Sequence, residues 1–277
     1  MSGKLDQLKT VLHGYGRTLV AYSGGVDSVF LAKVAHDVLG NDALAVIADS
    51  PSLPRREFQE AIEIAKQFGF PLHVVNTHEM ADDNYTSNPS NRCYFCKSEL
   101  FENLGEIAKR EGWRTIVYGE NASGLGDHRP GTAAAKEYQV RAPLKEVGLT
   151  KTEIRELSAK LGLPTAGKPQ MACLSSRIPY GEPVTEEALR MIEAAENVLR
   201  DAGFYEVRVR HHNMGNPKLY MARIEVGADE LGKFLKEEVR GAVTLALRKI
   251  GYAYVTLDLQ GYRRGSANEV LVKLKEN

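Results

Sequence analysis

The sequence contains no apolar run that approaches the roughly 20 residues a helix needs to cross a bilayer. Its first residues, Met-Ser-Gly-Lys-Leu-Asp-Gln-Leu-Lys, lack the apolar core of a secretory signal. These absences predict no membrane partner and a cytoplasmic location. The composition, with 43% hydrophobic and 26% charged residues, is typical of a globular protein.

An excess of charge of one sign is also missing, because 36 Lys and Arg residues balance 36 Asp and Glu residues. The chain as a whole therefore has no long-range attraction for a polyanion. We expect no nucleic-acid partner, although a local basic site for a smaller anion stays open.

Cysteine is scarce, and the count of three fits poorly with a disulfide framework. Two cysteines form the motif Cys93-Tyr-Phe-Cys96, and Cys173 lies far downstream. Three interpretations follow: unrelated thiols, a redox pair with a bystander, or three ligands of one metal centre.

The length of 277 residues suits two domains. In residues 1–165, apolar runs typical of buried strands alternate with segments of helical periodicity. Strands are expected over residues 17–22, 43–48, 72–75 and 115–118, and helices over 29–39, 57–68, 98–111 and from Thr150 onward. This order predicts an α/β fold with a doubly wound parallel sheet.

Ligands of such sheets bind beyond the carboxyl ends of the strands. The loops that open at this edge are residues 23–28, 49–56, 76–96 and 119–131. We expect a mobile loop over residues 82–92, and the cysteine pair falls in the loop after the third strand.

Residues 166–277 predict a smaller α+β domain that begins with a Gly-, Pro- and Ser-rich linker holding Cys173. Its expected helices are 186–202, 228–241 and 242–250, and its expected strands are 206–211, 220–226 and 252–257.

A Ser-Gly-Gly-Val-Asp-Ser motif joins the first strand to the first helix. Its residues are Ser23, Gly24, Gly25, Val26, Asp27 and Ser28. Two glycines let the backbone approach a ligand closely, and the amides at a helix N-terminus attract anions. The motif therefore predicts a pyrophosphate site rather than a mere tight turn. Asp27 would repel the anion unless a cation lay between them, which indicates Mg²⁺.

The motif resembles the PP-loop of the ATP pyrophosphatase families. The resemblance implies that ATP is cleaved to pyrophosphate while AMP is transferred to a carboxylate or carbonyl oxygen. It also implies that the loop at Asp49 and Ser50 holds adenine, and that the loop at Gly119 and Asn121 closes over the nucleotide. Lys97 is either a surface lysine or a phosphate contact.

The cysteines admit several kinds of chemistry. Cys93 and Cys96 could form a redox pair, or half of a zinc site that lacks a second pair. Together with Cys173 they would supply the three thiolates that leave one iron of a [4Fe–4S] cluster open.

Arg208 and Arg210 stand two apart on an expected strand and so share one face. They are either part of a solvated face or a phosphate site, for which arginine is well suited. Adjacent His211 and His212 are expected on the polar surface.

Over nearly its whole length the chain resembles the LarE family of PP-loop sulfur transferases. These enzymes convert pyridinium-3,5-biscarboxylic acid mononucleotide into the thiocarboxylated precursor of the nickel-pincer nucleotide. The segments that carry the resemblance are residues 23–28, 127–131, 175–181, 207–210 and 254–258. The resemblance implies that residues around the substrate phosphate or the reacting centre are Ser176, Arg177, Glu196, Arg208, Arg210 and Asp258. It also implies a homo-oligomer, a hexamer, and a sulfur-donor partner.

One departure decides the expected sulfur source. Some members sacrifice a cysteine that aligns with Ala172 here, whereas this chain has the three cysteines of the cluster-containing members. The resemblance therefore implies a [4Fe–4S] cluster held by Cys93, Cys96 and Cys173. The alternatives are a tRNA thiolation enzyme, a non-catalytic nucleotide or iron–sulfur binding protein, and an amidotransferase-type synthetase.

Overall fold

The computed structural model describes residues 2–124, 130–170, 172–215, 218–263 and 265–266. The chain divides into two compact units, each considered by itself. Unit 1 comprises Met1–Glu79 and Asn91–Met171, and unit 2 comprises Met80–Ser90 and Ala172–Asn277. The expected assignment of residues 1–165 to ATP binding and adenylation, and of residues 166–277 to substrate binding and oligomerisation, stays a prediction.

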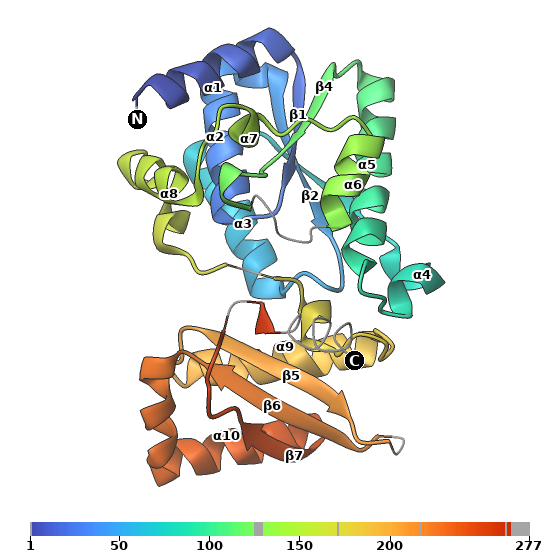
Figure 1. Ribbon diagram of the computed structural model, residues 1–277, viewed down its shortest axis with the longest axis vertical. Helices are drawn as coiled ribbons and strands as arrows, with labels where there is room; N and C mark the ends of the chain where they lie inside the picture. Colours follow the sequence, from blue (N-terminus) through green and yellow to red (C-terminus); the bar gives the residue numbers. More distant parts are fainter. Residues whose placement is uncertain (1, 125–129, 171, 216–217, 264, 267–277) are drawn as a thin grey trace, which may run out of the picture. The chain divides into compact units, whose positions relative to one another are not determined.

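Unit 1 is built on a four-stranded parallel sheet (Figure 1). The strands are β1 (Thr18–Tyr22), β2 (Ala43–Asp49), β3 (Leu72–Asn76) and β4 (Thr115–Tyr118), in the order β3-β2-β1-β4. The predicted α/β fold with a parallel sheet is therefore confirmed.

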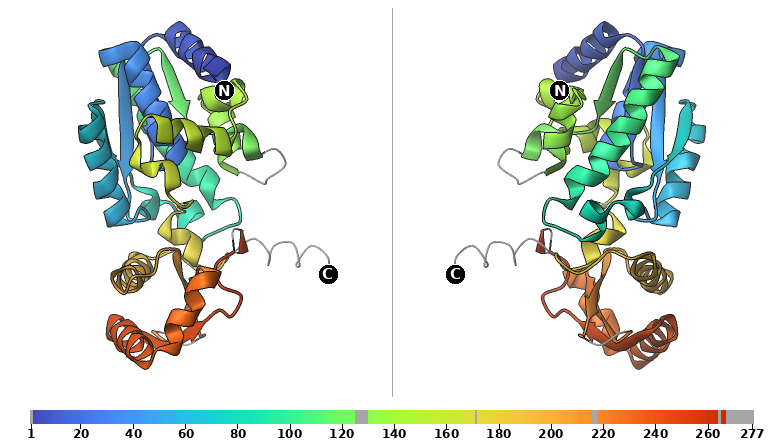
Figure 2. Two further views of the ribbon diagram at one scale, coloured as in Figure 1. Left: turned by 90° about the vertical axis from the view of Figure 1, so that its left-hand side faces the viewer. Right: turned by 90° about the vertical axis from the view of Figure 1, so that its right-hand side faces the viewer.

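Helices cover both faces of this sheet (Figure 2). On one side are α1 (Ser2–Tyr15), α2 (Val26–Leu39), α3 (Arg55–Phe68) and α8 (Lys151–Lys160), and on the other are α5 (Arg92–Glu111) and α6 (Pro130–Glu137).

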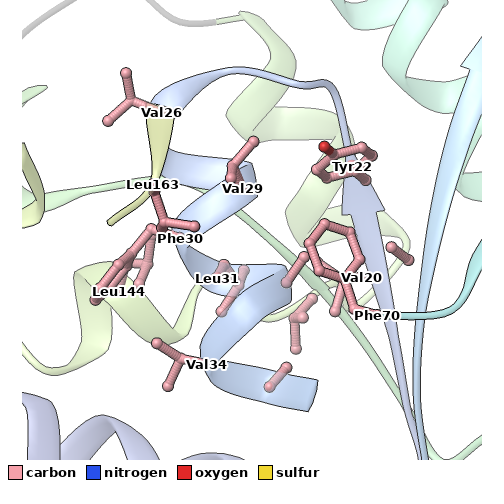
Figure 3. Packing of buried hydrophobic residues seen from close by; sticks show 14 of the residues in the cluster. Val20, Tyr22, Val26, Val29, Phe30, Leu31, Val34, Phe70, Leu144 and Leu163 are labelled. Atoms are coloured by element: carbon pink, nitrogen blue, oxygen red, sulfur yellow. The ribbon is translucent and has the colours of Figure 1, made fainter. Parts of the chain in front are cut away.

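The central strand β1 explains why both faces are covered. Val20 and Tyr22 point into the core beneath α2, while Leu19 and Ala21 belong to the core beneath α5. Successive strand residues point to opposite faces, so a continuous apolar run needs cover on both sides. Figure 3 shows the first of these cores, where Phe30 of α2 lies in the cluster with Val20 and Tyr22.

Unit 2 contains a three-stranded sheet, β5-β6-β7, covered on one face by two helices. Its elements are β5 (Val207–Asn213), β6 (Tyr220–Val226), β7 (Tyr252–Leu257), α9 (Glu186–Asp201) and α10 (Glu237–Ile250). β5 and β6 are antiparallel, whereas β6 and β7 are parallel. Val207 and Val209 point into the helical core. The alternate side chains, Arg208 and Arg210, therefore lie on the opposite, polar face.

Shorter helical turns complete the described secondary structure. They are α4 (Asp83–Thr86), α7 (Pro143–Glu146) and the 3-10 turns η1 (Gly40–Asp42), η2 (Glu79–Ala81), η3 (Ala122–Gly124), η4 (Pro164–Gly167), η5 (Leu174–Arg177) and η6 (Ala228–Leu235).

Three sequence-based expectations are wrong. The cysteine pair is not in a loop, because α5 begins at Arg92 with the helical pattern uninterrupted to Glu111. The helix expected over 228–241 is the 3-10 turn η6 followed by α10, since extended Lys236 (φ −75°, ψ 123°) separates them. The stretch expected as a mobile loop packs into unit 2, where Tyr85 and Asn88 are buried.

No helix within the described ranges is both long enough and apolar enough to span a membrane.

The start of α8 supplies a stability test. Thr150 accepts a hydrogen bond from the Glu153 amide at 3.3 Å, and Glu153 accepts one from the Thr150 amide at 2.9 Å. Thr150→Ala should lower the free energy of unfolding by about 1 kcal/mol, because the Glu153 amide at the helix end loses its side-chain acceptor. Urea denaturation measures the change.

Thr10→Ala is the matched control, since Thr10 is exposed within α1 and bonds to the carbonyl of Asp6. It should change stability by no more than about 0.5 kcal/mol. Equal midpoints for the two variants would contradict a stabilising cap at Thr150.

Candidate functional site

The turn between β1 and α2 has a backbone that requires glycine. Gly24 has φ +69°, and a Cβ at this position would lie 2.7 Å from the Cβ of Ala61 on α3. Gly25 occupies the N-cap of α2 and offers no side-chain oxygen to the first amides of the helix. Those amides and the helix dipole can therefore serve a bound anion.

Two serines close this turn. The Ser28 hydroxyl accepts the Ser23 amide at 3.1 Å and donates to the Gly25 carbonyl at 3.1 Å. The two hydroxyl oxygens lie 3.0 Å apart. Ser23 is exposed and Ser28 is buried, while the Val26 side chain belongs to the core (Figure 3). Val26 can therefore offer a ligand only its backbone amide.

Asp27 has one engaged and one unsatisfied oxygen. Its Oδ2 accepts a hydrogen bond from Lys151 Nζ at 2.7 Å. Its Oδ1 is buried and has no hydrogen-bond partner among the residues that the structure describes. A buried polar atom without a partner is costly, and a hard cation seeks carboxylate oxygen. The residue thus fits the predicted Mg²⁺.

The loop after β4 meets the same turn. A Cβ on Gly119 would lie 2.9 Å from the Ser28 nitrogen and 3.0 Å from the Asp27 carbonyl carbon. β1 and β4 are neighbours at the point where the strand order reverses, which is where doubly wound sheets bind ligands. Buried Asn121 stabilises this loop by accepting the Ser123 amide at 3.0 Å.

Glu120 in this loop is a carboxylate surrounded by donors. Tyr118 donates to one oxygen, and Lys145 Nζ lies 3.0 Å from the other. Burial would raise the pKa of Glu120, but the hydrogen bonds from Tyr118 and Lys145 outweigh burial and hold that pKa below its ordinary value.

The loop after β2 is held from two directions. Arg55 donates to Asp49 Oδ1 at 2.5 Å and to the Ser50 carbonyl at 2.7 Å. The hydroxyls of Ser50 and Ser52 lie 2.8 Å apart, and both donate to buried Glu79. The sequence does not predict the role of Glu79, because an isolated glutamate far from the Ser-Gly-Gly-Val-Asp-Ser motif has no recognisable pattern.

The first two turns of α5 carry Cys93, Cys96 and Lys97. Their spacing of three and four residues places them on one side of the helix. Cys93 is exposed and Cys96 is half-buried. Lys97 Nζ lies 4.7 Å from the centre of the Tyr118 ring, and a Cβ on Gly131 would come within 2.5 Å of Lys97 Cδ. Lys97 is therefore packed against the end of β4.

In unit 2, Arg177 forms a buried ion pair with Glu196. Arg177 Nε and NH2 donate to the two Glu196 oxygens at 2.8 and 3.0 Å. Burial opposes both charges. Mutual attraction nevertheless holds the pKa of Arg177 above, and the pKa of Glu196 below, their ordinary values.

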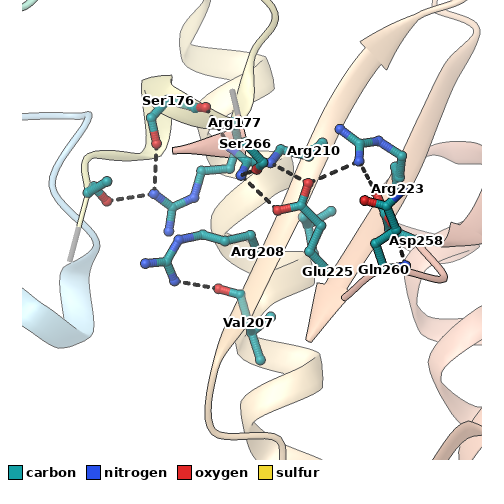
Figure 4. A network of polar contacts seen from close by, with 12 residues as sticks. Ser176, Arg177, Val207, Arg208, Arg210, Arg223, Glu225, Asp258, Gln260 and Ser266 are labelled. Carbon is teal, nitrogen blue, oxygen red and sulfur yellow. Dashed lines mark hydrogen bonds and ion pairs between the residues drawn. The ribbon is translucent and has the colours of Figure 1, made fainter. Parts of the chain in front are cut away.

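A second charged network lies on the polar face of the sheet (Figure 4). Arg210 binds both oxygens of Glu225, at 3.0 and 2.7 Å, and donates to the Ser176 carbonyl at 2.9 Å. Arg223 bridges Glu225 and Asp258. The structure therefore brings Ser176, Arg210 and Asp258 into one network.

Arg208 sits beside this network. It donates to the Val207 carbonyl at 2.7 Å, and its guanidinium lies 4.9 Å from the Tyr262 ring centre. Burial, and secondarily the positive charge of Arg177, lower the pKa of Arg208. An anion beside Arg208 would offset this cost.

The three cysteines belong to different units. Cys93 and Cys96 are in unit 1, whereas half-buried Cys173 is in unit 2. Across the described parts of the chain, no three or more His, Cys, Asp or Glu residues cluster so that they could hold a metal ion. A shared metal centre stays a prediction. The Asp127 motif (residues 127–131) lies largely outside the described residues, since only 130–131 are included.

Glycines, serines and an aspartate at the switch point of a doubly wound sheet define a PP-loop ATP-binding protein. A family model described as NAD synthase matches residues 4–94. Partial matches include an argininosuccinate synthase of Natronomonas pharaonis, 28% identical over 54% of this chain and 40% of that protein.

Two relatives match nearly the whole chain. An uncharacterised protein of Synechocystis sp. is 44% identical over 99% of this chain and 100% of its own length. The pyridinium-3,5-bisthiocarboxylic acid mononucleotide synthase of Lactiplantibacillus plantarum is 35% identical over 99% of this chain and 96% of its own. The chain belongs to the family of this synthase, the LarE family, and is an ATP-using synthase or transferase.

The close contact at Gly119 provides a test of ATP binding. Gly119→Ala should weaken ATP affinity about tenfold or more, because the added methyl group meets backbone atoms that cannot move without shifting the turn at Asp27 and Ser28. Isothermal titration with Mg²⁺ and ATP measures this.

Gly105→Ala is the control. Gly105 lies inside α5, and a Cβ there would meet nothing within 4 Å. It should leave ATP affinity unchanged and slightly favour the helix. Equal ATP affinities for Gly119→Ala and Gly105→Ala would show that ATP binding does not depend on the close contact between Gly119 and the turn at Asp27 and Ser28.

The prediction that His211 lies on the polar surface is wrong. It is buried, and Nδ1 lies 3.1 Å from the Tyr252 hydroxyl oxygen. Burial lowers the pKa of His211 to about 4. Between pH 4 and the ordinary histidine pKa of about 6.5, His211 is protonated in the unfolded chain but neutral in the folded protein. The free energy of unfolding therefore decreases as the pH falls from about 6.5 to 4.

His211→Gln should flatten this pH dependence by up to about 3 kcal/mol, measured by urea denaturation across that range. The control is His73→Gln, at an exposed histidine of β3, which should leave this pH dependence unchanged. A His211→Gln profile as steep as that of the parent would rule out His211 as the titrating group.

Proposed function

We propose that the chain uses ATP to adenylate a carboxylate of pyridinium-3,5-biscarboxylic acid mononucleotide and then replaces the AMP by sulfur. The observation that carries this proposal is the 35% identity to a pyridinium-3,5-bisthiocarboxylic acid mononucleotide synthase over 99% of the chain. The name of that relative describes a product with two thiocarboxylates. The proposed place of the reaction is the biosynthesis of the nickel-pincer nucleotide.

The chemistry explains why ATP is needed. A carboxylate resists substitution because its leaving group would be oxide. In the proposed first step a carboxylate oxygen attacks the α-phosphorus of ATP, and pyrophosphate leaves. A hydrosulfide then adds to the acyl carbon, the bond to AMP breaks, and a thiocarboxylate, AMP and a proton result.

Residues of unit 1 would serve the nucleotide. The backbone amides of residues 23–28 would hold pyrophosphate, and Asp27 Oδ1 would bind Mg²⁺, which neutralises charge that develops on the leaving group. Lys97 would add a phosphate contact. The loops at Asp49 and Ser50, and at Gly119 and Asn121, would enclose the adenosine.

Residues of unit 2 would serve the substrate. Arg208 would bind its phosphate, with the Ser176 hydroxyl as a further contact, because guanidinium groups are well suited to phosphate. A phosphate contact for Arg210 stays a prediction, since Arg210 is engaged with Glu225. Asp258 would act through Arg223, to which it is paired. A direct substrate contact for Arg177 or Glu196 stays a prediction, since each is engaged with the other.

The cysteines fit a [4Fe–4S] cluster by their chemistry. Cys93 and Cys96 share one side of α5 and are accessible, and Cys173 is also partly accessible. These three thiolates would hold the cluster, which when bound would supply an open iron as the carrier of sulfur. The family resemblance places a sacrificial cysteine at the position of Ala172, which has no thiol, so an external sulfur donor would be required. Assembly as a homo-hexamer stays a prediction.

The proposal predicts that pyrophosphate forms from ATP only when the pyridinium mononucleotide is present. Asp27→Asn should lower this rate about 100-fold, because the metal loses a ligand and the leaving group loses charge neutralisation. A coupled pyrophosphate assay measures it. Substrate-independent pyrophosphate release, or none under any condition, would overturn the adenylation step.

The metal centre is tested separately. After anaerobic purification, Cys93→Ala, Cys96→Ala and Cys173→Ala should each lose most of the iron and acid-labile sulfide. Lys109→Ala, at an exposed position later on α5, is the control and should retain both. Unchanged iron in any cysteine variant would remove that residue as a ligand.

A further inference from the structure

The side chain of Arg177 is fully buried, and all three of its guanidinium nitrogens donate hydrogen bonds. Nε and NH2 bind Glu196, while NH1 lies 2.6 Å from the Ala172 carbonyl oxygen and 2.9 Å from the Cys173 carbonyl oxygen. NH1 also lies 3.0 Å from the Ser176 hydroxyl. One guanidinium therefore holds the carbonyl groups of the two peptide bonds that flank the Cα atom of Cys173.

Glu196 makes this arrangement rigid. Its side chain is 2% exposed, and its Oε1 also accepts the Val209 amide of β5 at 3.1 Å. The carboxylate is thus fixed by the edge of the sheet as well as by its own helix, α9. Because a planar guanidinium binds a carboxylate in a fork, fixing Glu196 also fixes the direction in which NH1 points.

The rest of the turn that contains Cys173 is fastened by other residues. Arg210 binds the Ser176 carbonyl, and the Tyr85 hydroxyl lies 2.5 Å from the Ser175 hydroxyl. Asn88 Nδ2 donates to the Pro179 carbonyl at 2.7 Å. These contacts hold residues 175–179, whereas Arg177 extends the restraint back to Cys173.

We propose that Arg177 is a positioning residue that fixes the backbone of Cys173, with Glu196 as its anchor, and that it does not bind the substrate phosphate. This deepens the proposed function, on which it rests. Arg177 orients the thiol that serves sulfur transfer, while Arg208 binds the phosphate. A buried arginine with its donors already engaged would have to break the Glu196 pair before it bound an anion, and breaking a buried pair is strongly unfavourable.

The test uses a chain with a single thiol. Because the protein has three cysteines, Cys93→Ala with Cys96→Ala leaves Cys173 alone to react. In this metal-free background, Arg177→Lys should raise the rate of iodoacetamide modification about fivefold, since the unfastened turn opens more often. Glu196→Gln, which keeps the shape of the side chain, should raise it in the same direction and serves if the lysine variant does not fold.

Arg190→Ala is the matched control. Arg190 lies on the same helix as Glu196 and forms an exposed ion pair with Glu186. It should leave the modification rate unchanged. Circular dichroism shows that each variant is folded. Parent-like modification rates in both Arg177→Lys and Glu196→Gln would overturn the positioning role.

A kinetic split separates positioning from substrate binding. With all cysteines restored, Arg177→Lys should lower kcat for thiocarboxylate formation while KM for the pyridinium mononucleotide stays within about twofold. Arg208→Lys should instead raise that KM. A raised KM in Arg177→Lys with unchanged thiol reactivity would make Arg177 a substrate contact. Thiol modification needs no ATP, substrate or sulfur, so a failed sulfur-transfer proposal would leave that result intact.

Discussion

The close approach of two loops at the switch point of the parallel sheet is the constraint on which unit 1 depends. Gly119 after β4 touches the backbone of Asp27 and Ser28 at the start of α2, at a distance that excludes any side chain. Gly24 meets α3 in the same way on the other side of the turn. The anion-binding amides are thus held by packing against two neighbours, which preorganises them before any ligand arrives.

Unit 2 is organised by a different constraint, the need to pair buried charge. Arg177 with Glu196, and Arg210 with Glu225, remove four charged groups from water on or beside one sheet face. Burying each group separately would be prohibitive, so each forked pair fixes both partners and the elements that carry them. The turn at Cys173 is therefore fastened by charged side chains, since Arg177 and Arg210 both donate to its carbonyl groups.

The sequence predicted the features that local patterning determines. The apolar run of β1, the glycine turn and the capping box at Thr150 each depend on neighbouring residues, and all three are present. Features that depend on distant partners were not predictable in this way. Glu79 supports Ser50 from 29 residues away, and the pairing of Arg177 with Glu196 requires α9 to lie against the turn at Cys173. The prediction of where α5 begins was wrong for a local reason, because a polar, cysteine-containing segment was interpreted as a loop.

Arginines that look alike in sequence differ in their surroundings because their acceptors differ. Arg177 and Arg210 each meet a carboxylate in a fork, so their charge is compensated within the protein. Arg208 lies on the same strand as Arg210, yet burial and its neighbour Arg177 lower its pKa. In the proposed function, an incoming phosphate would offset this cost at Arg208. In the proposals for unit 2, the surroundings of each guanidinium, rather than its place in a motif, therefore distinguish Arg177 as a positioning residue from Arg208 as a phosphate ligand.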